Sequence, residues 1–345
     1  MIIFTSITLN YLPKAKILAA SIKRFHPTWK FHLLINDRLV TNENKNVNDL
    51  LDNNLFNQII WLDELRIENK LTWIFKHTVV ELCTAVKGFY LQELMEKGFD
   101  KIVYIDPDIV LFNKLSLVEQ LLDDHAILLT PHLLEFSDDT QAIMDNEIAG
   151  TLKHGTFNLG FIAVNAKRSE GKLFINWWAK RCLEYCYADY ERGLFTDQKW
   201  CDLVPSFFED YYIIRDPGYD VASWNLDKRV LSMSEDGNVV INDKSPLRFY
   251  HFTGYDSGAG SVMTDRYSQG NSIVNELWDW YKRELEENGQ AVWGSMKCFY
   301  DSYENGEEIP KAARVLYRNR EDLMRAFPDP YRVDDQGGYW GWKGK

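Results

Sequence analysis

The chain has 345 residues, 46% of them hydrophobic and 26% charged, which is ordinary for a folded protein that buries a sizeable core. Its formal net charge of −12 argues against a nucleic-acid partner, because such binding depends on Lys and Arg side chains that neutralise phosphates. No stretch reaches the roughly 18 apolar residues that a membrane span needs, so any membrane association is expected to be peripheral.

The five cysteines are an odd number without C-x-x-C spacing, so they indicate neither a disulfide framework nor a structural zinc site. Reduced thiols in the cytoplasm are therefore expected. The N-terminus is apolar, but it is too short for the apolar region of a signal peptide and lacks a charged leader. We predict that residues 2–7 form the first core strand.

The next residues predict a helix and a second strand. Apolar side chains recur with helical spacing from Ala15 to Phe25, and residues 31–35 form a second apolar β run. The short connections favour parallel strands joined by a crossover helix. Residues 41–57 are rich in Asn and Asp and are predicted to be a surface excursion, for which the pattern leaves helix and loop open.

A short strand is predicted at residues 59–62, and a helix at residues 73–97 with Gly98 as its C-terminal stop. The other predicted elements are strands at 126–130, 157–165 and 248–254, helices that contain Trp177–Trp178 and begin at 196–200, a Gly-rich loop at 258–260 and a helical region beyond about residue 270. The strand at 157–165 is expected to be interrupted near its start by Asn158 and Gly160.

The sharpest feature is the apolar β run at residues 101–111, which Asp106, Pro107 and Asp108 break at its centre. Proline cannot donate to a sheet ladder, so the strand must end or bend there. In an open α/β sheet, ligands bind outside the carboxyl ends of the strands. The two carboxylates are hard ligands of the kind that Mg²⁺ or Mn²⁺ prefers. His251, at the end of a separate β run, either completes a mixed ligand set or is a structural histidine, which a lone His more often is. The alternative is a turn in which the Asp residues cap backbone amides.

Several motifs together resemble glycosyltransferase family 8, which includes glycogenin and bacterial lipopolysaccharide galactosyltransferases. They are Asn10-Tyr11, A-V-K-G-F-Y at 85–90, K-I-V-Y-I-D-P-D at 101–108, F-N-L-G-F at 157–161, T-D-Q at 196–198 and H-F-T-G at 251–254. Their order along roughly residues 1–260 is that of the family. The resemblance implies a GT-A fold, a Rossmann-like α/β domain with a mostly parallel sheet, at residues 1–265. A helical extension with a Trp- and Gly-rich tail is expected at residues 266–345.

The resemblance also implies a metal and donor site. Asp106, Asp108 and His251 would bind a divalent cation, Mn²⁺ or Mg²⁺, that bridges the donor diphosphate. Donor-binding roles are implied for Thr5, Asn10, Tyr11, Lys87, Asp106 and Gly254, the first three near the nucleobase and ribose. Lys87 stands where the family usually has Arg, so the positive charge is kept while bidentate geometry is lost.

Catalytic roles are implied for Asn158, which matches a residue facing the donor sugar, and for Asp197 and Gln198, which match a pair beside its anomeric carbon. Family members retain the anomeric configuration by front-face departure of the diphosphate, so Gln198 would act as a stabiliser. The family's last motif continues to K-P-W, whereas Tyr255-Asp256-Ser257-Gly258 follows here. The loop instead resembles a looser bacterial set of polysaccharide-associated transferases that carry F-H-F-S-G-F-D.

The predicted function is therefore transfer of a hexose from a nucleotide-diphosphate sugar, expected to be UDP-linked, to a saccharide or lipid-linked saccharide acceptor in surface polysaccharide or lipopolysaccharide assembly. A sugar-nucleotide pyrophosphorylase is one alternative, but that class begins with a Gly-rich triphosphate loop and residues 5–14 contain no Gly. A noncatalytic glycan-binding protein with the same fold is the other, and it would be marked by loss of the metal ligands. The expected location is the cytoplasm, with peripheral contact at the inner face of the membrane as an option.

Four other groups of residues lie outside this predicted site. A basic stripe of Lys311, Arg314, Arg318, Arg320 and Arg325 suggests either membrane contact or, preferably, a solvated helix face. The tail Tyr339–Trp342 would fold over the acceptor cleft or pack on a partner. His132 is interpreted as a hydrogen-bonded loop residue, and Cys182 with Cys186 as core.

Overall fold

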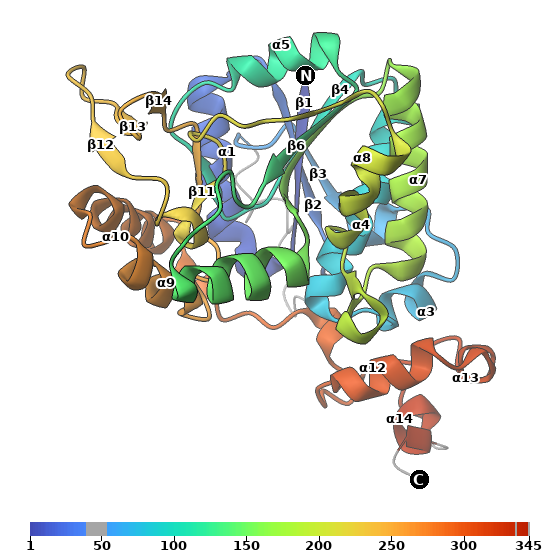
Figure 1. Ribbon diagram of the computed structural model, residues 1–345. Coiled ribbons are helices and arrows are strands. Elements are labelled where there is room, and N and C mark those ends of the chain that lie inside the picture. The colour runs from blue at the N-terminus through green and yellow to red at the C-terminus, as the bar shows by residue number, and fades with distance from the viewer. Residues whose placement is uncertain (39–53, 335–336, 344–345) are drawn as a thin grey trace.

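A seven-stranded sheet lies at the centre of the computed structural model, which describes residues 1–38, 54–334 and 337–343 (Figure 1). The strand order is β10-β6-β7-β4-β1-β2-β3. The strands are β1 (Ile2–Ile7), β2 (Lys30–Ile35), β3 (Gln58–Trp61), β4 (Lys101–Ile105), β6 (Ile127–Pro131), β7 (Phe157–Asn165) and β10 (Tyr211–Ile213). Most of the predicted surface excursion at residues 41–57 lies outside the described residues.

The strands of this sheet run parallel to one another except β7, which is antiparallel to both β4 and β6. The α/β class with a mostly parallel sheet is thus confirmed. The predicted interruption of β7 is wrong, because Asn158 and Gly160 lie within one continuous buried strand. The reversed direction brings the start of β7 to the carboxyl end of β4, where the Asp106 N–H donates to the Gly160 carbonyl at 2.7 Å.

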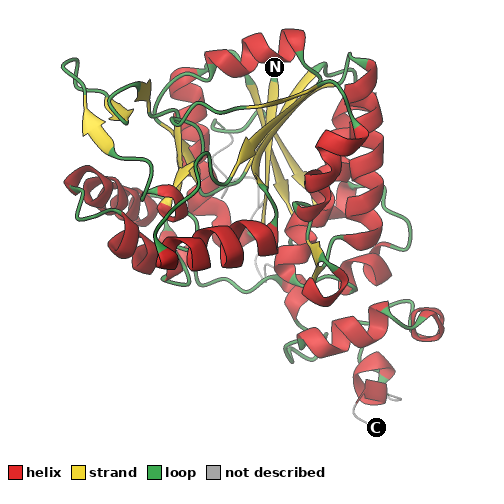
Figure 2. Cartoon of the chain, viewed as in Figure 1, coloured by secondary structure: helices red, strands yellow, loops and turns green. Residues whose placement is uncertain are grey.

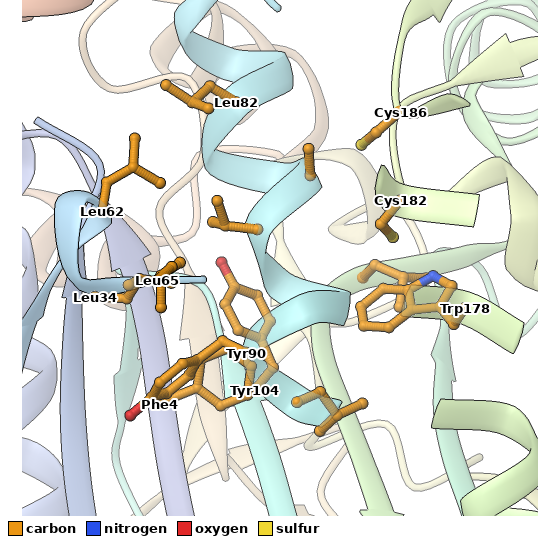
Figure 3. Close-up of a cluster of buried hydrophobic side chains, with 14 of the residues drawn as sticks. Phe4, Leu34, Leu62, Leu65, Leu82, Tyr90, Tyr104, Trp178, Cys182 and Cys186 are labelled. Atoms are coloured by element: carbon orange, nitrogen blue, oxygen red, sulfur yellow. The ribbon is translucent and has the colours of Figure 1, made fainter. Parts of the chain in front are cut away.

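Helices cover both faces of the sheet (Figure 2). On one face, α1 (Leu12–Phe25) packs on β1 and α5 (Ser116–Asp124) packs on β6 and β7, in a core that includes Ile3 and Ile7. On the other, α4 (Val79–Glu96) and α7 (Ser169–Tyr185) pack side by side over Phe4 and its neighbours. Figure 3 shows this second core, in which the Phe4 ring lies against Tyr90 and Tyr104 with centroids 5.2 and 5.1 Å away. Burial on both faces explains why the strands are almost continuously apolar.

The helix predicted at residues 73–97 is two helices, α3 (Lys70–Phe75) and α4. The break comes at Thr78, whose backbone N–H donates to Glu81 Oε2 at 2.8 Å while the Glu81 N–H donates to Thr78 Oγ1 at 3.4 Å. This reciprocal capping box satisfies two amides that the first turn of α4 leaves without helical partners. A new helix therefore begins where the apolar pattern alone suggested a continuous one.

The bend predicted at Pro107 is confirmed, since the chain leaves the main sheet there. Beyond it, β5 (Ile109–Leu111) pairs antiparallel with β15 (Phe249–His251), and β15 pairs parallel with β11 (Val221–Ala222). The remaining strands are β8 (Ala188–Asp189), β9 (Leu194–Phe195), β12 (Leu231–Met233), β13 (Val239–Ile241) and β14 (Ser245–Pro246).

Two expectations in the second half of the chain need correction. The Gly-rich loop expected at 258–260 is instead the start of a helix, α9 (Ala259–Tyr267), which Gly258 caps with φ of 75°. The segment from Thr196 begins with a turn and continues as a 3-10 helix, Lys199–Leu203, before the short α8 (Val204–Phe207).

The other helical segments are α6 (Thr140–Ala142), a π-helix η3 (Ile143–Leu152), α10 (Ser272–Glu287), α11 (Gln290–Trp293), α12 (Lys311–Arg318), α13 (Glu321–Ala326) and α14 (Gly338–Lys343). Short 3-10 turns are η1 (Leu9–Tyr11), η2 (Leu62–Glu64), η4 (Tyr190–Arg192), η6 (Ser223–Asn225) and η7 (Phe299–Asp301).

The C-terminal helices α12, α13 and α14 lie beyond the α3 end of the molecule (Figure 1). Neither interpretation of the basic stripe holds for Arg314, which is 1% exposed and donates to the Phe75, His77 and Tyr300 carbonyls. The tail packs on these helices and not on a cleft, because Tyr339 is buried and its hydroxyl donates to the Ala313 carbonyl at 2.7 Å. Among the described helices, none combines the length and apolarity needed to cross a membrane.

Candidate metal and donor site

Asp106, Asp108 and His251 meet where β4 ends and the small sheet begins. Asp106 directly follows β4, and Asp108 directly precedes β5. The pairing of β5 with β15 sets His251 opposite Ile109, and the Phe252 N–H donates to the Asp108 carbonyl at 2.8 Å. His251 Nε2 lies 3.1 Å from Asp108 Oδ1 and 4.0 Å from Asp106 Oδ2. One ligand atom from each residue lies within 4.8 Å of the others, a spacing that suits a single cation.

The surroundings also fit a divalent cation. A Cβ added at Gly160 would lie 2.6 Å from Asn158 Oδ1, 2.7 Å from His251 Cε1 and 3.1 Å from Asp106 Oδ2. Any side chain at this position would therefore press on two of the three ligands. Two carboxylates and an imidazole match the oxygen and nitrogen donors of Mn²⁺, and the carboxylates match Mg²⁺.

Electrostatic coupling within the cluster is strong. Burial would lower the pKa of His251, but Asp108 and Asp220 outweigh burial and raise it to about 10. Burial would raise the pKa of Asp108, but His251 and, after it, Lys14 outweigh burial and lower it. The carboxylate of Asp108 is thus held in its charged form, the form that binds a cation.

A cavity of about 610 Å³ opens beside this cluster at the carboxyl ends of the parallel strands. The predicted site residues that line it are Tyr11, Lys87, Asp106, Asp108, Asn158, Asp197, Gln198 and His251. The fold thus brings together side chains from β4, β7, β15, α4 and the loops between them. A volume of this size is typical of small-molecule sites.

Thr5, Asn10 and Gly254 do not line the cavity. Thr5 is fully buried, whereas the next residue, Ser6, faces the cavity and donates to the Cys83 carbonyl at 2.7 Å. Asn10 accepts a hydrogen bond from the Thr8 hydroxyl at 2.6 Å. Gly254 adopts φ of 74°, and its neighbour Thr253 reaches the cavity instead.

Lys87 joins two acidic residues at the cavity wall. Its Nζ lies 3.2 Å from Asp106 Oδ1, 3.2 Å from Asp197 Oδ2 and 3.3 Å from the Leu159 carbonyl. Burial opposes the positive charge, but Asp106 and Asp197 outweigh burial and raise the pKa of Lys87. The charge predicted for this position is therefore present, and two carboxylates hold it in place.

Asp197 and Gln198 are fixed by the backbone around them. The Gln198 side chain accepts from the Leu159 N–H at 3.0 Å and donates to the His154 carbonyl at 3.2 Å. The preceding residue, Thr196, has φ of 45°, a conformation that non-glycine residues adopt rarely. Burial raises the pKa of Asp197 although Lys87 acts to lower it. The Gln198 side chain is thus held at both ends of its amide, and the Asp197 carboxylate is held by Lys87.

Sequence reasoning left His132 out of the site, yet it lines the cavity. Its Nδ1–H donates to the Thr156 carbonyl at 3.4 Å, so Nε2 can accept from the Asn158 amide at 3.2 Å. Trp224 also lines the cavity and donates to the His132 carbonyl at 3.1 Å. The position of His132 directly after β6 was a usable signal, because β6 ends at the same sheet edge as β4. No comparable signal in the sequence indicated Trp224.

A π-helix, η3, covers one side of the cavity. This helix was not predicted from the sequence either. Asp145, Asn146 and Ala149 of this helix line the cavity. Asp145 is tied to α9, since it pairs with Arg266 and accepts from the Tyr267 hydroxyl at 2.8 Å. π-Helices are rare and frequently occur at functional sites.

Comparison with known proteins gives distant relatives. No family model matches the chain. It is 30% identical to the uncharacterized protein YfnF of Bacillus subtilis strain 168 over 195 residues, which cover 55% of this chain and 62% of YfnF. It is 27% identical to YfnD of the same strain over 264 residues, which cover 73% of this chain and 70% of YfnD. The match therefore spans less than two thirds of YfnF.

The solved structures that resemble this chain include glycosyltransferases. The galactosyltransferase LgtC, in complex with donor and acceptor sugar analogs, is 16% identical with a TM-score of 0.45, over 81% of this chain and all of LgtC. GlyE of Streptococcus pneumoniae TIGR4 is 14% identical with a TM-score of 0.41, over 82% of this chain and 63% of GlyE. Mouse xyloside xylosyltransferase 1 is 11% identical with a TM-score of 0.42, over 73% of this chain and 97% of that one. Function is therefore inferred from the site of this chain itself.

Proposed function

We propose that the protein is a metal-dependent glycosyltransferase that moves a hexose from a nucleotide-diphosphate sugar, UDP-linked, to a saccharide acceptor. The observation that carries the proposal is the cluster of Asp106, Asp108 and His251 at the edge of a cavity that Lys87 also lines. Such a site suits a single ligand that contains both a diphosphate and a sugar. The order of the sequence motifs supports the same activity.

In this proposal the three clustered side chains hold Mn²⁺ or Mg²⁺ against the donor diphosphate. A bound cation offsets the negative charge that develops on the departing nucleoside diphosphate. Lys87 adds a buried positive charge on the opposite side of Asp106. Tyr11 also lines the cavity, and in this proposal its ring stacks on the nucleobase.

The polar side chains of Gln198, Asn158 and Asp197 suit a sugar transfer that retains the configuration at the anomeric carbon. The bond between the anomeric carbon and the diphosphate breaks, and the acceptor hydroxyl forms the new bond on the same face while its proton passes to the departing phosphate oxygen. Gln198 is held at both ends of its amide, so it stabilises the charge on the sugar as a fixed dipole and is not free to attack. Asn158 and Asp197 face the same space.

We further propose that the acceptor belongs to surface-glycan assembly in the cytoplasm and can be lipid-linked. Met144 and Ile148 are large apolar side chains that η3 exposes to solvent, next to cavity-lining residues of the same helix. Apolar groups at this rim would suit an acceptor that is carried on a lipid.

The test is donor hydrolysis. The protein is incubated with Mn²⁺ and a panel of UDP-, GDP- and dTDP-sugars, and the release of free nucleotide is measured with and without EDTA. We expect metal-dependent release of UDP from one UDP-hexose, and loss of that release in Asp108→Asn. The proposal is wrong if no donor is bound or hydrolysed and Asp108→Asn changes nothing. Formation of a nucleoside triphosphate from donor and pyrophosphate would instead identify a pyrophosphorylase.

A further inference from the structure

Asp220 is a buried carboxylate that the site described so far does not use. It directly precedes β11 and is 0% exposed, and neither carboxylate oxygen has a hydrogen-bond partner among the described residues. Its backbone has φ of 55°, in the left-handed region that few non-glycine residues adopt. A carboxylate buried in this way is costly unless something compensates for it. Strain and missing partners together indicate a functional constraint.

The group that faces Asp220 is His251. Its Nδ1 is also buried without a hydrogen-bond partner among the described residues, and it lies 3.6 Å from Asp220 Oδ1. On the other side of the ring, Nε2 lies 3.1 Å from Asp108 Oδ1. The imidazole is therefore placed between two carboxylates, one at each nitrogen.

Backbone pairing fixes this arrangement. The parallel pairing of β11 with β15 sets Ala222 opposite His251, and Asp220 lies two residues before Ala222, directly ahead of β11. The Asp220 carbonyl accepts from Arg229 Nη1 and from Asn225 Nδ2, both at 2.9 Å. Trp224 packs edge-on against the imidazole with ring centroids 5.5 Å apart. These contacts hold the backbone of Asp220 in place, and Trp224 lies against one side of the His251 ring.

We propose that Asp220 is a positioning residue that holds His251 with Nδ1–H toward its carboxylate, so that the Nε2 lone pair faces the cation site. This inference rests on the metal site of the proposed function and deepens it. A neutral imidazole carries its proton on one nitrogen only, and a metal can bind only at the other. Carboxylate partners of metal-binding histidines fix that choice and typically contribute ten- to hundredfold in metal affinity.

The test measures cation binding with no sugar donor present. Mn²⁺ affinity is determined by titration calorimetry for the full-length wild type, Asp220→Ala, Asp220→Asn and the control Asp37→Asn. Asp37 is a buried carboxylate that accepts from the Leu9, Arg38 and Phe299 N–H groups. We expect roughly ten- to hundredfold weaker binding in Asp220→Ala, a smaller loss in Asp220→Asn and wild-type affinity in Asp37→Asn.

A second readout follows the tautomer itself. Protein labelled with ¹⁵N-histidine is loaded with Mg²⁺, and the two imidazole nitrogens of His251 are assigned by NMR with a His251→Gln variant as reference. We expect a protonated Nδ1 in the wild type and a mixture of tautomers in Asp220→Asn, which keeps the shape of the side chain if Asp220→Ala fails to fold.

Two results would overturn the inference, and they differ in meaning. If the wild type binds Mn²⁺ and the folded Asp220 variants bind it equally well with the same tautomer, Asp220 does not position His251 and the proposed function stands. If the wild type binds no divalent cation at all, the metal site of the proposed function fails together with the inference.

Discussion

Arg318 Nη1 lies 3.4 Å from both carboxylate oxygens of Glu81, and both side chains are almost completely buried. The same carboxylate accepts from the Thr78 and Ala188 N–H groups, each at 2.8 Å. Arg318 also stacks over the Tyr187 ring, 4.0 Å from its centroid. This ion pair therefore ties α12 to the start of α4.

The first prediction concerns this ion pair. Arg318→Met should reduce the free energy of unfolding by about 3 kcal/mol, because it leaves the Glu81 carboxylate buried without its counter-charge. Arg325→Met is the matched control, since Arg325 pairs with Glu321 on the surface of α13 and such pairs contribute about 0–1 kcal/mol. Urea unfolding followed by circular dichroism measures both. Equal effects of the two substitutions would mean that the buried pair contributes no more than an exposed one.

The second prediction concerns the space over the metal ligands. Gly160→Ala should abolish Mn²⁺ binding, or weaken it by at least about tenfold, because the new Cβ would displace His251 or Asn158. Gly150→Ala is the control, since the nearest atom to its new Cβ is the Asp145 carbonyl oxygen at 3.3 Å and Gly150 also lines the cavity. Titration calorimetry checks both variants. Wild-type affinity in a folded Gly160→Ala would contradict the fit of a cation at this position.

The third prediction is a loss of stability at acidic pH. Burial lowers the pKa of His26 to about 4, and its Nε2 accepts from the Leu115 N–H at 2.8 Å, which requires an unprotonated nitrogen. Because the unfolded chain takes up the proton near pH 6.5, stability is complete above that pH and falls as pH drops toward 4. His26 alone should cost about 1–2 kcal/mol between pH 7 and pH 5.

His26→Gln isolates this contribution. Glutamine can accept the same hydrogen bond but does not titrate, so the variant should lose less stability than the wild type between pH 7 and pH 5. Urea unfolding at several pH values gives the slope for each protein. If the two slopes are identical, His26 titrates normally in the folded state. Burial also lowers the pKa of His32 and His77 to about 4, so part of the acid sensitivity should remain in His26→Gln.

The sequence predicted the parts of the site that interrupt a strong pattern. Asp106 and Asp108 stand out because they break an apolar run, and a strand that must end at Pro107 places them at a sheet edge. The antiparallel direction of β7 could not be predicted, because alternation and apolarity are the same in either direction. That direction is what brings Asn158 and Gly160 to the cation site.

The positions that the sequence could not predict depend on strand register or on contacts with distant residues. Thr5 and Ser6 differ by one position in β1, and a shift of one residue moves a side chain to the other face of the sheet. Asp220 directly precedes the two-residue strand β11, and Trp224 lies in the three-residue turn η6 that follows it. Segments this short show no periodicity, so the approach of both residues to His251 depends on the pairing of β11 with β15. The burial of Arg314 depends on residues more than 200 positions earlier, which no local pattern reports.

The last prediction separates the charge of Lys87 from the metal site. Its ammonium and a cation at the three-residue cluster would share the Asp106 carboxylate. Lys87→Met should therefore keep or strengthen Mn²⁺ binding in the absence of donor, while it lowers kcat/KM for donor hydrolysis by about 10²–10³ because a charge aimed at the diphosphate is lost. Lys87→Arg, which keeps the charge, should retain most of the activity.

The free energy of unfolding of the Lys87 variants has to be measured together with their activity. Lys87→Met leaves the buried Asp197 carboxylate without its ion pair, so we expect the free energy of unfolding to fall by about 3 kcal/mol. The assays should therefore be run well below the melting temperature of the variant. Calorimetric titration with Mn²⁺ and a nucleotide-release assay then give affinity and turnover for the same folded sample. Parallel losses of Mn²⁺ affinity and turnover in Lys87→Met would show that the ammonium supports the metal ligands and does not act on the donor. Loss of turnover with intact Mn²⁺ binding would place the charge of Lys87 on the reacting diphosphate.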